Sequence, residues 1–71
     1  MRGSFMTIFC QGRETETAAT TVAAFLAERG IDGTRAIVEY AGEVYAPGAD
    51  LSSVALKQGA ALEIFKVMAG G

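Results

Sequence analysis

The sequence predicts a small α+β domain in which one helix packs on a mixed sheet, in the order β-β-α-β-β-β. Three observations predict this class. Several short stretches alternate between two faces, one stretch alone has helical spacing, and turn-forming residues separate these stretches. The chain has 71 residues, of which 51% are hydrophobic and 20% charged. This composition is that of a globular protein, and the length allows one small core and no second domain.

The first two strands are predicted over residues 6–11 and 13–18. Residues 6–11 alternate between two faces, which is strand periodicity, and Gly12 marks a turn after them. In residues 13–18, β-branched threonines can face a core while the intervening glutamates face water. Together these two stretches predict an N-terminal hairpin.

One helix is predicted over about residues 21–29. Thr20 or Thr21 can cap it by accepting a backbone hydrogen bond, and apolar residues follow at helical spacing with alanines between them. Gly30 can supply the left-handed residue after the last turn, and Ile31 can fold back on the helix as in a Schellman motif.

The second half of the chain predicts three more strands. Residues 36–40 alternate again, and a tight turn leads from them into a short strand over residues 43–45. Residues 50–56 have a mixed pattern, with Leu51, Val54 and Leu56 available to close the open end of the core. In the final strand, residues 62–67, Leu62 and Ile64 face inward, and Glu63, Phe65 and Val67 face the other way.

The predicted core collects the inward positions of these elements. Its members are Met6, Ile8, Cys10, Val22, Phe25, Leu26, Val38, Tyr40, Val44, Leu62 and Ile64. Cys10 is expected to pack there as a small apolar residue.

The composition excludes several classes of function. The net charge is −2 without a block of like charges, which disfavours nucleic acid and acidic lipid surfaces as partners. With no histidine and a single cysteine, the chain cannot build a Cys/His zinc site, an intrachain disulfide or a serine-histidine dyad. No catalytic or metal-binding residues are therefore predicted. Because no apolar run is long enough to span a bilayer and no signal peptide is visible, we expect a cytoplasmic protein without a membrane partner.

The two ends of the sequence differ from the rest. Residues 1–5 are typical of an expression-vector leader, which makes Met6 the expected natural start. We expect residues 6–67 to form the domain and residues 68–71 to be a flexible tail. The tail ends in Gly-Gly, a pair that chance would place at a terminus roughly once in 200 sequences at average glycine usage.

A C-terminal Gly-Gly suggests chemistry at the chain end itself. The free carboxylate is a resonance-stabilised anion, so an outside agent must activate it. Adenylation would form a mixed anhydride at Gly71, which a sulfide, thiol or amine can attack. Glycine lacks a Cβ, so a narrow active-site channel can close around its backbone. In this interpretation the domain is the substrate of an enzyme and not itself an enzyme.

Residues 36–44, Ala-Ile-Val-Glu-Tyr-Ala-Gly-Glu-Val, and residues 62–71, Leu-Glu-Ile-Phe-Lys-Val-Met-Ala-Gly-Gly, resemble the ThiS-like sulfur carrier proteins of the ThiS/MoaD family. The most specific part is a hydrophobic strand that ends in Val-x-Ala-Gly-Gly. The resemblance implies a ubiquitin-like β-grasp fold and a C-terminal thiocarboxylate, made through an acyl-adenylate by an E1-like adenylyltransferase that consumes ATP. In that family the sulfur comes from a cysteine-derived persulfide, as a cysteine desulfurase provides. It goes to thiazole synthase for thiamine biosynthesis.

The resemblance also implies which residues act. Gly71 would carry the sulfur, and the tail that would lie in the partner's channel comprises Val67, Met68, Ala69 and Gly70. Strand alternation separately places Phe65 and Val67 opposite the core, where together with Ile37 they would form an exposed apolar patch for a partner. The alternative is that the segment 50–56 covers these side chains.

The residues do not decide which pathway accepts the sulfur or to which class of function the chain belongs. At residues 45–48 the chain reads Tyr-Ala-Pro-Gly, where the family often has Val-Pro-Arg. The carrier of molybdopterin synthesis shares the Ala-Gly-Gly end, and other thiocarboxylate carriers serve other sulfur-containing metabolites. From other classes of function, the chain can be a ubiquitin-like modifier joined to lysines through Gly71, or a β-grasp interaction module whose tail has no role.

Overall fold

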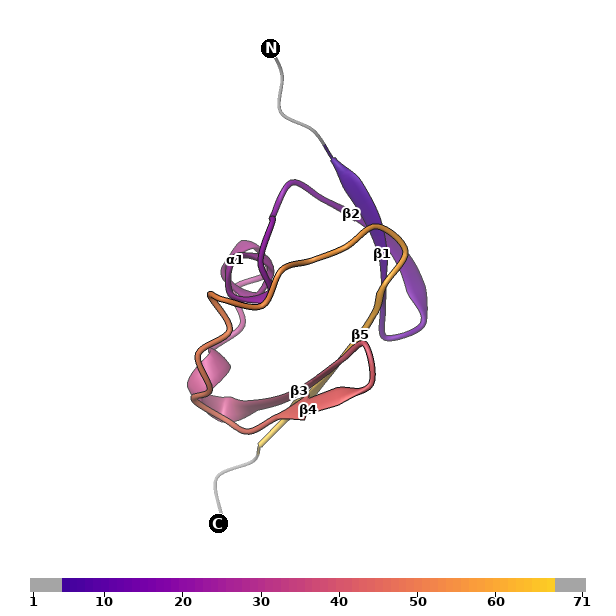
Figure 1. Ribbon diagram of the computed structural model, residues 1–71. Coiled ribbons are helices and arrows are strands. Elements are labelled where there is room, and N and C mark those ends of the chain that lie inside the picture. The colour runs from indigo at the N-terminus through magenta and orange to yellow at the C-terminus, as the bar shows by residue number, and fades with distance from the viewer. Residues whose placement is uncertain (1–4, 68–71) are drawn as a thin grey trace.

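The structure is a computed structural model that describes residues 5–67 (Figure 1). Its elements are β1 (Met6–Cys10), β2 (Arg13–Thr17), α1 (Val22–Glu28), the 3-10 helix η1 (Gly33–Arg35), β3 (Ala36–Tyr40), β4 (Glu43–Tyr45) and β5 (Ala61–Lys66). The strands form one mixed sheet in the order β2-β1-β5-β3-β4. This confirms the predicted α+β class and the β-β-α-β-β-β order, and the arrangement is consistent with a β-grasp.

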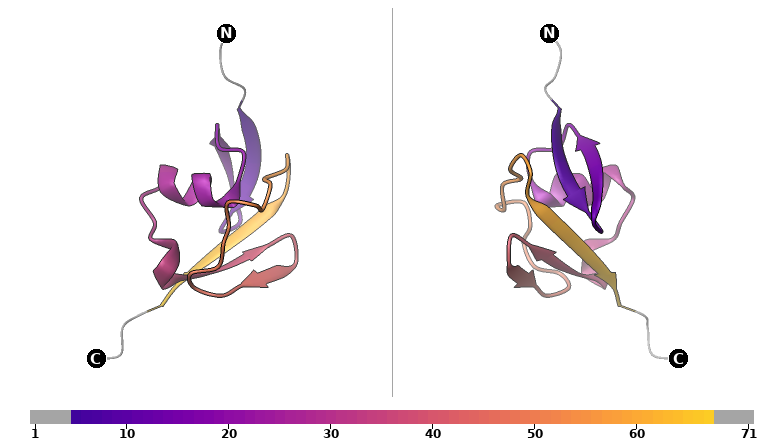
Figure 2. Two further views of the ribbon diagram at one scale, coloured as in Figure 1. Left: turned by 60° about the vertical axis from the view of Figure 1, so that its left-hand side comes forward. Right: turned by 90° about the vertical axis from the view of Figure 1, so that its right-hand side faces the viewer.

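The last strand, β5, lies in the middle of the sheet. It runs parallel to β1 and antiparallel to β3, while β2 and β4 are paired by hairpins to β1 and β3. The helix α1 crosses one face of this sheet (Figure 2). The strand that leads to the C-terminus is therefore held between two neighbours and against the core.

Both hairpins close through two-residue turns with positive φ at both positions. Gln11 and Gly12 have φ of 54° and 77°, and Ala41 and Gly42 have φ of 52° and 86°. Positive φ at both central residues is the type I′ geometry, whose twist matches that of two paired strands. These turns fix the register of both hairpins.

The helix α1 begins and ends as the sequence predicts. The Thr21 hydroxyl oxygen accepts a hydrogen bond from the Ala24 amide at 3.1 Å, which caps the N-terminus. At the other end Gly30 has a φ of 70°. The Ile31 amide donates to the Leu26 carbonyl at 2.8 Å, which is the long hydrogen bond of a Schellman motif.

The core lies between α1 and the sheet. Its buried members are Ile8, Thr17, Ala19, Val22, Phe25, Leu26, Ala36, Val38, Tyr40, Leu51, Leu56, Leu62 and Ile64. Leu51 and Leu56 close its open end, as the sequence predicts. Met6 and Cys10 are only partly buried and pack at its margin. Most of the predicted core is thereby confirmed.

The prediction that Val44 belongs to the core is wrong, because its side chain is 68% exposed. The two-residue turn of the second hairpin places Val44 opposite Glu39, and Tyr45 opposite Val38. Directly opposite residues of an antiparallel pair share a face of the sheet. Tyr45 therefore packs against the core beside Val38, and Val44 lies on the outer face of the sheet.

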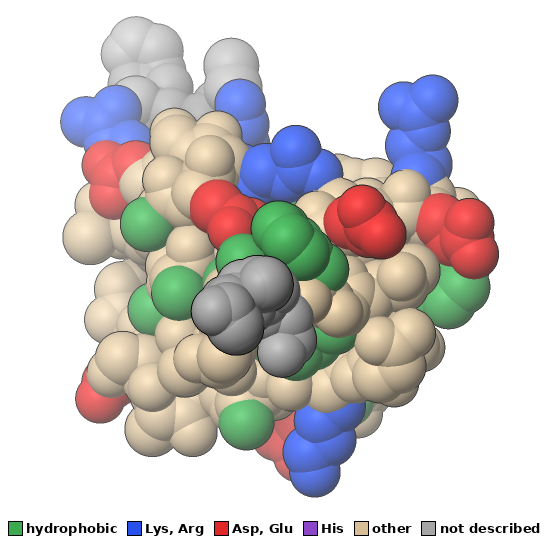
Figure 3. Space-filling model, turned by 90° about the horizontal axis from the view of Figure 1, so that it is seen from above, with side chains coloured by type: hydrophobic (Ala, Val, Ile, Leu, Met, Phe, Trp, Pro, Cys, Tyr) green, Lys and Arg blue, Asp and Glu red, His purple; other side chains and the backbone are tan. Residues whose placement is uncertain are grey.

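Residues 5–67 contain no helix that is long and apolar enough to cross a membrane. In the same range, no three histidine, cysteine or acidic residues gather as a metal site would require. On the face shown in Figure 3, acidic and basic side chains are interspersed, and neither kind gathers into a separate charged patch.

Candidate functional site

The strand β5 carries the chain from the core toward its C-terminal end. Leu62 and Ile64 are buried and anchor β5 against α1. On the β3 side the pairing continues past the end of the strand, because the Val67 amide donates to the Arg35 carbonyl at 2.8 Å. The backbone is therefore held up to the last residue that the structure describes.

On the β1 side, the side chain of Gln11 takes the place of a paired strand. Its Oε1 accepts a hydrogen bond from the Ile64 amide at 2.9 Å, and its Nε2 donates to the Ile64 carbonyl at 3.0 Å. Its backbone amide donates to the Leu62 carbonyl at 3.0 Å. Since β1 turns away into its hairpin at this point, the side chain satisfies backbone groups of β5 that have no strand beside them.

Sequence reasoning missed this contribution of Gln11. The contact joins residues 53 positions apart, so no local pattern contains it. One signal was available, because asparagine and glycine are the usual residues of a type I′ turn. A glutamine at a turn position with a φ of 54° is unusual and therefore a candidate for a specific contact.

The outer face of the sheet carries apolar side chains where β5 ends. Phe65 is 49% exposed and Val67 is 44% exposed. Ile37 is half-buried and lies directly opposite Phe65 in the pairing of β3 with β5. Directly opposite side chains lie within contact range of each other. Val67 pairs with Arg35 beyond the end of β5, and strand alternation puts its side chain on the same face as that of Phe65. We call Ile37, Phe65 and Val67 the outer-face patch.

The segment 50–56 does not cover this patch. It lies along α1, where the Leu51 carbonyl accepts a hydrogen bond from Ala23 and the Val54 carbonyl accepts one from Val22. The alternative in which this segment covers the patch is therefore wrong. That a partner binds the patch stays a prediction.

An acidic pair lies beside the outer-face patch. Glu39 and Glu63 are directly opposite each other on β3 and β5, on the same face as Phe65. Like charges in this arrangement destabilise a sheet. These two carboxylates make the sheet face beside the patch acidic.

The predicted site is only partly within the described residues. The pairing of β3 with β5 places Ile37 and Phe65 together on one face. Val67 is exposed directly after β5, where it also lines a small pocket with Ile31 and Lys66. The predicted sulfur attachment at Gly71, the channel residues Met68, Ala69 and Gly70, and the predicted flexibility of the tail lie outside the described residues.

Cys10 is partly buried and packs at the margin of the core. Burial raises the pKa of the Cys10 thiol, an effect that the charge of Arg29 opposes and that of Glu63 reinforces. A raised pKa favours the neutral thiol over the nucleophilic thiolate. This agrees with the predicted packing role of Cys10.

Comparison of the chain with protein-family models, with curated proteins and with solved structures found no match.

Proposed function

We propose that this protein is a sulfur carrier whose Gly71 is adenylated and converted to a thiocarboxylate that donates sulfur in thiazole synthesis for thiamine. One observation carries the proposal: a Val-x-Ala-Gly-Gly end follows directly on the central strand of a β-grasp sheet. Pairing of β5 up to Val67 supports the proposal, because it gives the domain a fixed point directly before the four residues that would enter an enzyme's active site.

The proposed chemistry belongs to the partners. A carboxylate oxygen of Gly71 attacks the α-phosphorus of ATP, and pyrophosphate leaves, which gives the acyl-adenylate. The terminal sulfur of a persulfide on a cysteine desulfurase or a relay protein attacks the carbonyl carbon, and AMP leaves. A thiol then reduces the resulting acyl disulfide and releases the thiocarboxylate. The thiol is oxidised to a disulfide in this last step.

The chain's own contribution is recognition. An E1-like adenylyltransferase would bind the outer-face patch, with basic residues facing Glu39 and Glu63, and accept the tail into its channel. Thiazole synthase would use the same face after sulfur loading. Both interactions bury exposed apolar area, which is the main source of affinity in a protein interface.

Mass spectrometry of the intact chain tests the proposal. The protein is incubated with the adenylyltransferase of its own genome, ATP, cysteine and a cysteine desulfurase. We expect a species heavier by about 16 Da, the difference between sulfur and oxygen, which alkylation of the thiocarboxylate shifts further. A variant lacking Gly71 is the control and should not change. Absence of the species while the enzyme still consumes ATP with this chain would contradict the proposal.

The same experiments separate the alternatives. If the thiocarboxylate donates sulfur to molybdopterin or another sulfur-containing product, but not to the thiazole, the protein is the sulfur carrier of that other pathway. Conjugates on a denaturing gel that require Gly71 would indicate a ubiquitin-like modifier. Partner binding and function that persist without Gly70 and Gly71 would indicate an interaction module with an incidental tail.

A further inference from the structure

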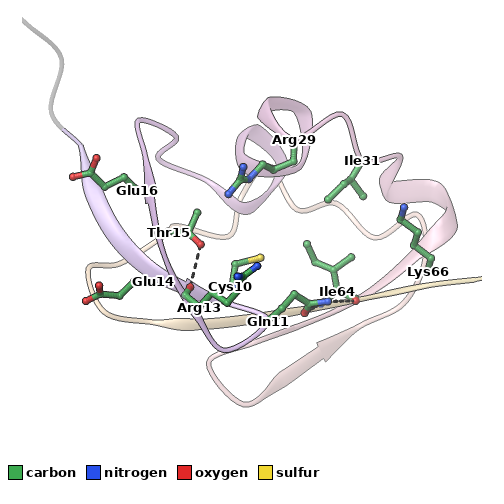
Figure 4. Close-up of a pocket in the computed structure, with 10 residues that line it drawn as sticks. All are labelled: Cys10, Gln11, Arg13, Glu14, Thr15, Glu16, Arg29, Ile31, Ile64 and Lys66. Carbon is green, nitrogen blue, oxygen red and sulfur yellow. Dashed lines mark hydrogen bonds between the residues drawn. The ribbon is translucent and has the colours of Figure 1, made fainter.

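A groove of about 870 Å³ opens on the helix side of the sheet, away from the outer-face patch. It lies between β2, the end of α1 and the end of β5 (Figure 4). Cys10, Ile31 and Ile64 give it an apolar lining, and the basic residues Arg13, Arg29 and Lys66 also line it.

Three basic side chains from distant parts of the sequence thus meet at one groove, although the chain's net charge is −2. Arg13 pairs with Cys10 and therefore lies on the helix side of the sheet. The guanidinium of Arg29 lies over the Phe25 ring, with Cζ 5.3 Å from its centroid, and this contact holds it at the groove wall. The groove therefore suits acidic groups.

Glu14 and Glu16 stand at the rim of the groove, but their side chains belong to the outer face. In the register of the first hairpin they lie opposite Phe9 and Thr7, which alternate with the core-facing Ile8. Figure 4 shows both carboxylates on the side away from Arg29 and Lys66. They therefore leave the basic lining open to a ligand.

The strand β2 is an edge strand, with β1 as its one neighbour among the described strands. The Phe9 amide donates to the Ala60 carbonyl, away from β2. Phe9 and Glu14 are thus a non-hydrogen-bonded pair, and the backbone groups of Glu14 point away from β1. Because backbone groups of every second residue in a strand point to the same side, the N–H and carbonyl of Glu16 also point away from β1. The edge beside the groove therefore presents two backbone N–H groups and two carbonyls.

We propose that an extended segment of a partner protein adds to the free edge of β2 as a further strand. Its side chains alternate between two faces. Apolar and acidic side chains on one face would enter the groove toward Arg13 and Arg29. Basic side chains on the other face would lie beside Glu14 and Glu16.

A second copy of this chain fits the same edge poorly. When two β2 strands pair antiparallel through their outward backbone groups, every register that pairs Glu14 or Glu16 of one copy with an outward residue within β2 of the other places two glutamates opposite each other. Opposed like charges destabilise a sheet. The edge therefore discriminates against self-association and favours a partner with the complementary pattern.

A synthetic peptide serves as the probe. It is blocked at both ends and about eight residues long, an ordinary strand length, and lysines alternate with valines and aspartates along it. A peptide of the same composition with the alternation scrambled controls for charge alone. Titration into the isotope-labelled full chain is followed by NMR. The alternating peptide should shift the Glu14 and Glu16 amides and protect them from hydrogen exchange, and the scrambled peptide should not.

Two variants test the two parts of the proposal. Glu16→Pro removes an outward N–H group without removing a ladder hydrogen bond, which edge strands tolerate, and it should abolish the protection of the edge. Arg29→Glu should weaken binding about fivefold, the upper range for an exposed ion pair. Lys57→Glu makes the same charge change outside the groove and should leave binding within about twofold.

Four results would overturn the proposal. These are no shift of the edge amides at millimolar peptide, equal binding of the two peptides, shifts centred on Phe65 and Val67, or equal effects of Arg29→Glu and Lys57→Glu. Concentration-dependent shifts of the Glu14 amide without peptide would assign the edge to a second copy. Because Arg29→Glu lies outside the sheet, it keeps the test valid if Glu16→Pro does not fold.

Discussion

At the scale of single residues, two side chains satisfy backbone groups where regular pairing stops. Gln11 does so for β5. Tyr40 does so for the segment between β4 and β5, because its hydroxyl donates to the Ala55 carbonyl and accepts from the Lys57 amide, both at 2.9 Å. A backbone group that loses its partner costs more free energy than an average hydrogen bond contributes. These residues are therefore more important to the fold than their polar character suggests.

Gln11→Ala is predicted to lower the free energy of unfolding by about 1–2 kcal/mol, because two hydrogen bonds to Ile64 are lost. Urea unfolding measures this. Gln11→Asn is the matched control. It keeps the amide and suits the positive φ better, but its side chain is one methylene too short to span the same distance. It should recover only part of the loss, and full wild-type stability of Gln11→Asn would show that the reach to β5 is unimportant.

At the scale of elements, local sequence patterns predict most of the helices and strands. Alternation predicted the strands, and the spacing after Thr21 together with Gly30 predicted both ends of α1. The alternation of residues 43–45 does not show which face is inward. The two-residue turn decides it, because it places Val44 opposite Glu39. The pairing of Ile37 with Phe65 required the strand order, which no local pattern contains. The basic groove arises from residues of three separate elements, and a linear pattern cannot bring them together.

The turn between β3 and β4 offers a prediction at this scale. Ala41 has a φ of 52°, a conformation that costs a residue with a Cβ roughly 1 kcal/mol or more. Ala41→Gly should therefore raise the free energy of unfolding by up to ~1 kcal/mol, reduced by the greater entropy of glycine in the unfolded chain. Ala24→Gly, on the exposed side of α1, is the control and should lower it by about 1 kcal/mol. A loss of stability in both variants would contradict the strained turn.

At the scale of the whole molecule, the two proposed binding surfaces lie on opposite faces of the sheet. The outer-face patch adjoins the end of β5, and the basic groove lies on the helix side beside β2. A partner that accepts the tail and a partner that extends the β2 edge would therefore meet different residues. Ile64 and Lys66 connect the two surfaces, because both line the groove and both adjoin Phe65 of the outer-face patch in the sequence.

The proposed recognition by the adenylyltransferase predicts that exposed apolar residues of the outer face differ in importance. Phe65→Thr should weaken binding of the enzyme by about tenfold, the effect expected for an aromatic residue at the centre of an interface. Val44→Thr removes a residue that is more exposed but lies beyond Glu39, away from the end of β5, and it should change binding less than about threefold. Threonine keeps the β-propensity of both positions, so the stability of the domain should change little. The measurement is the rate of thiocarboxylate formation over a range of enzyme concentrations. A defect of Phe65→Thr that high enzyme concentration restores identifies lost binding, whereas equal effects of the two substitutions would place the interface elsewhere on the molecule.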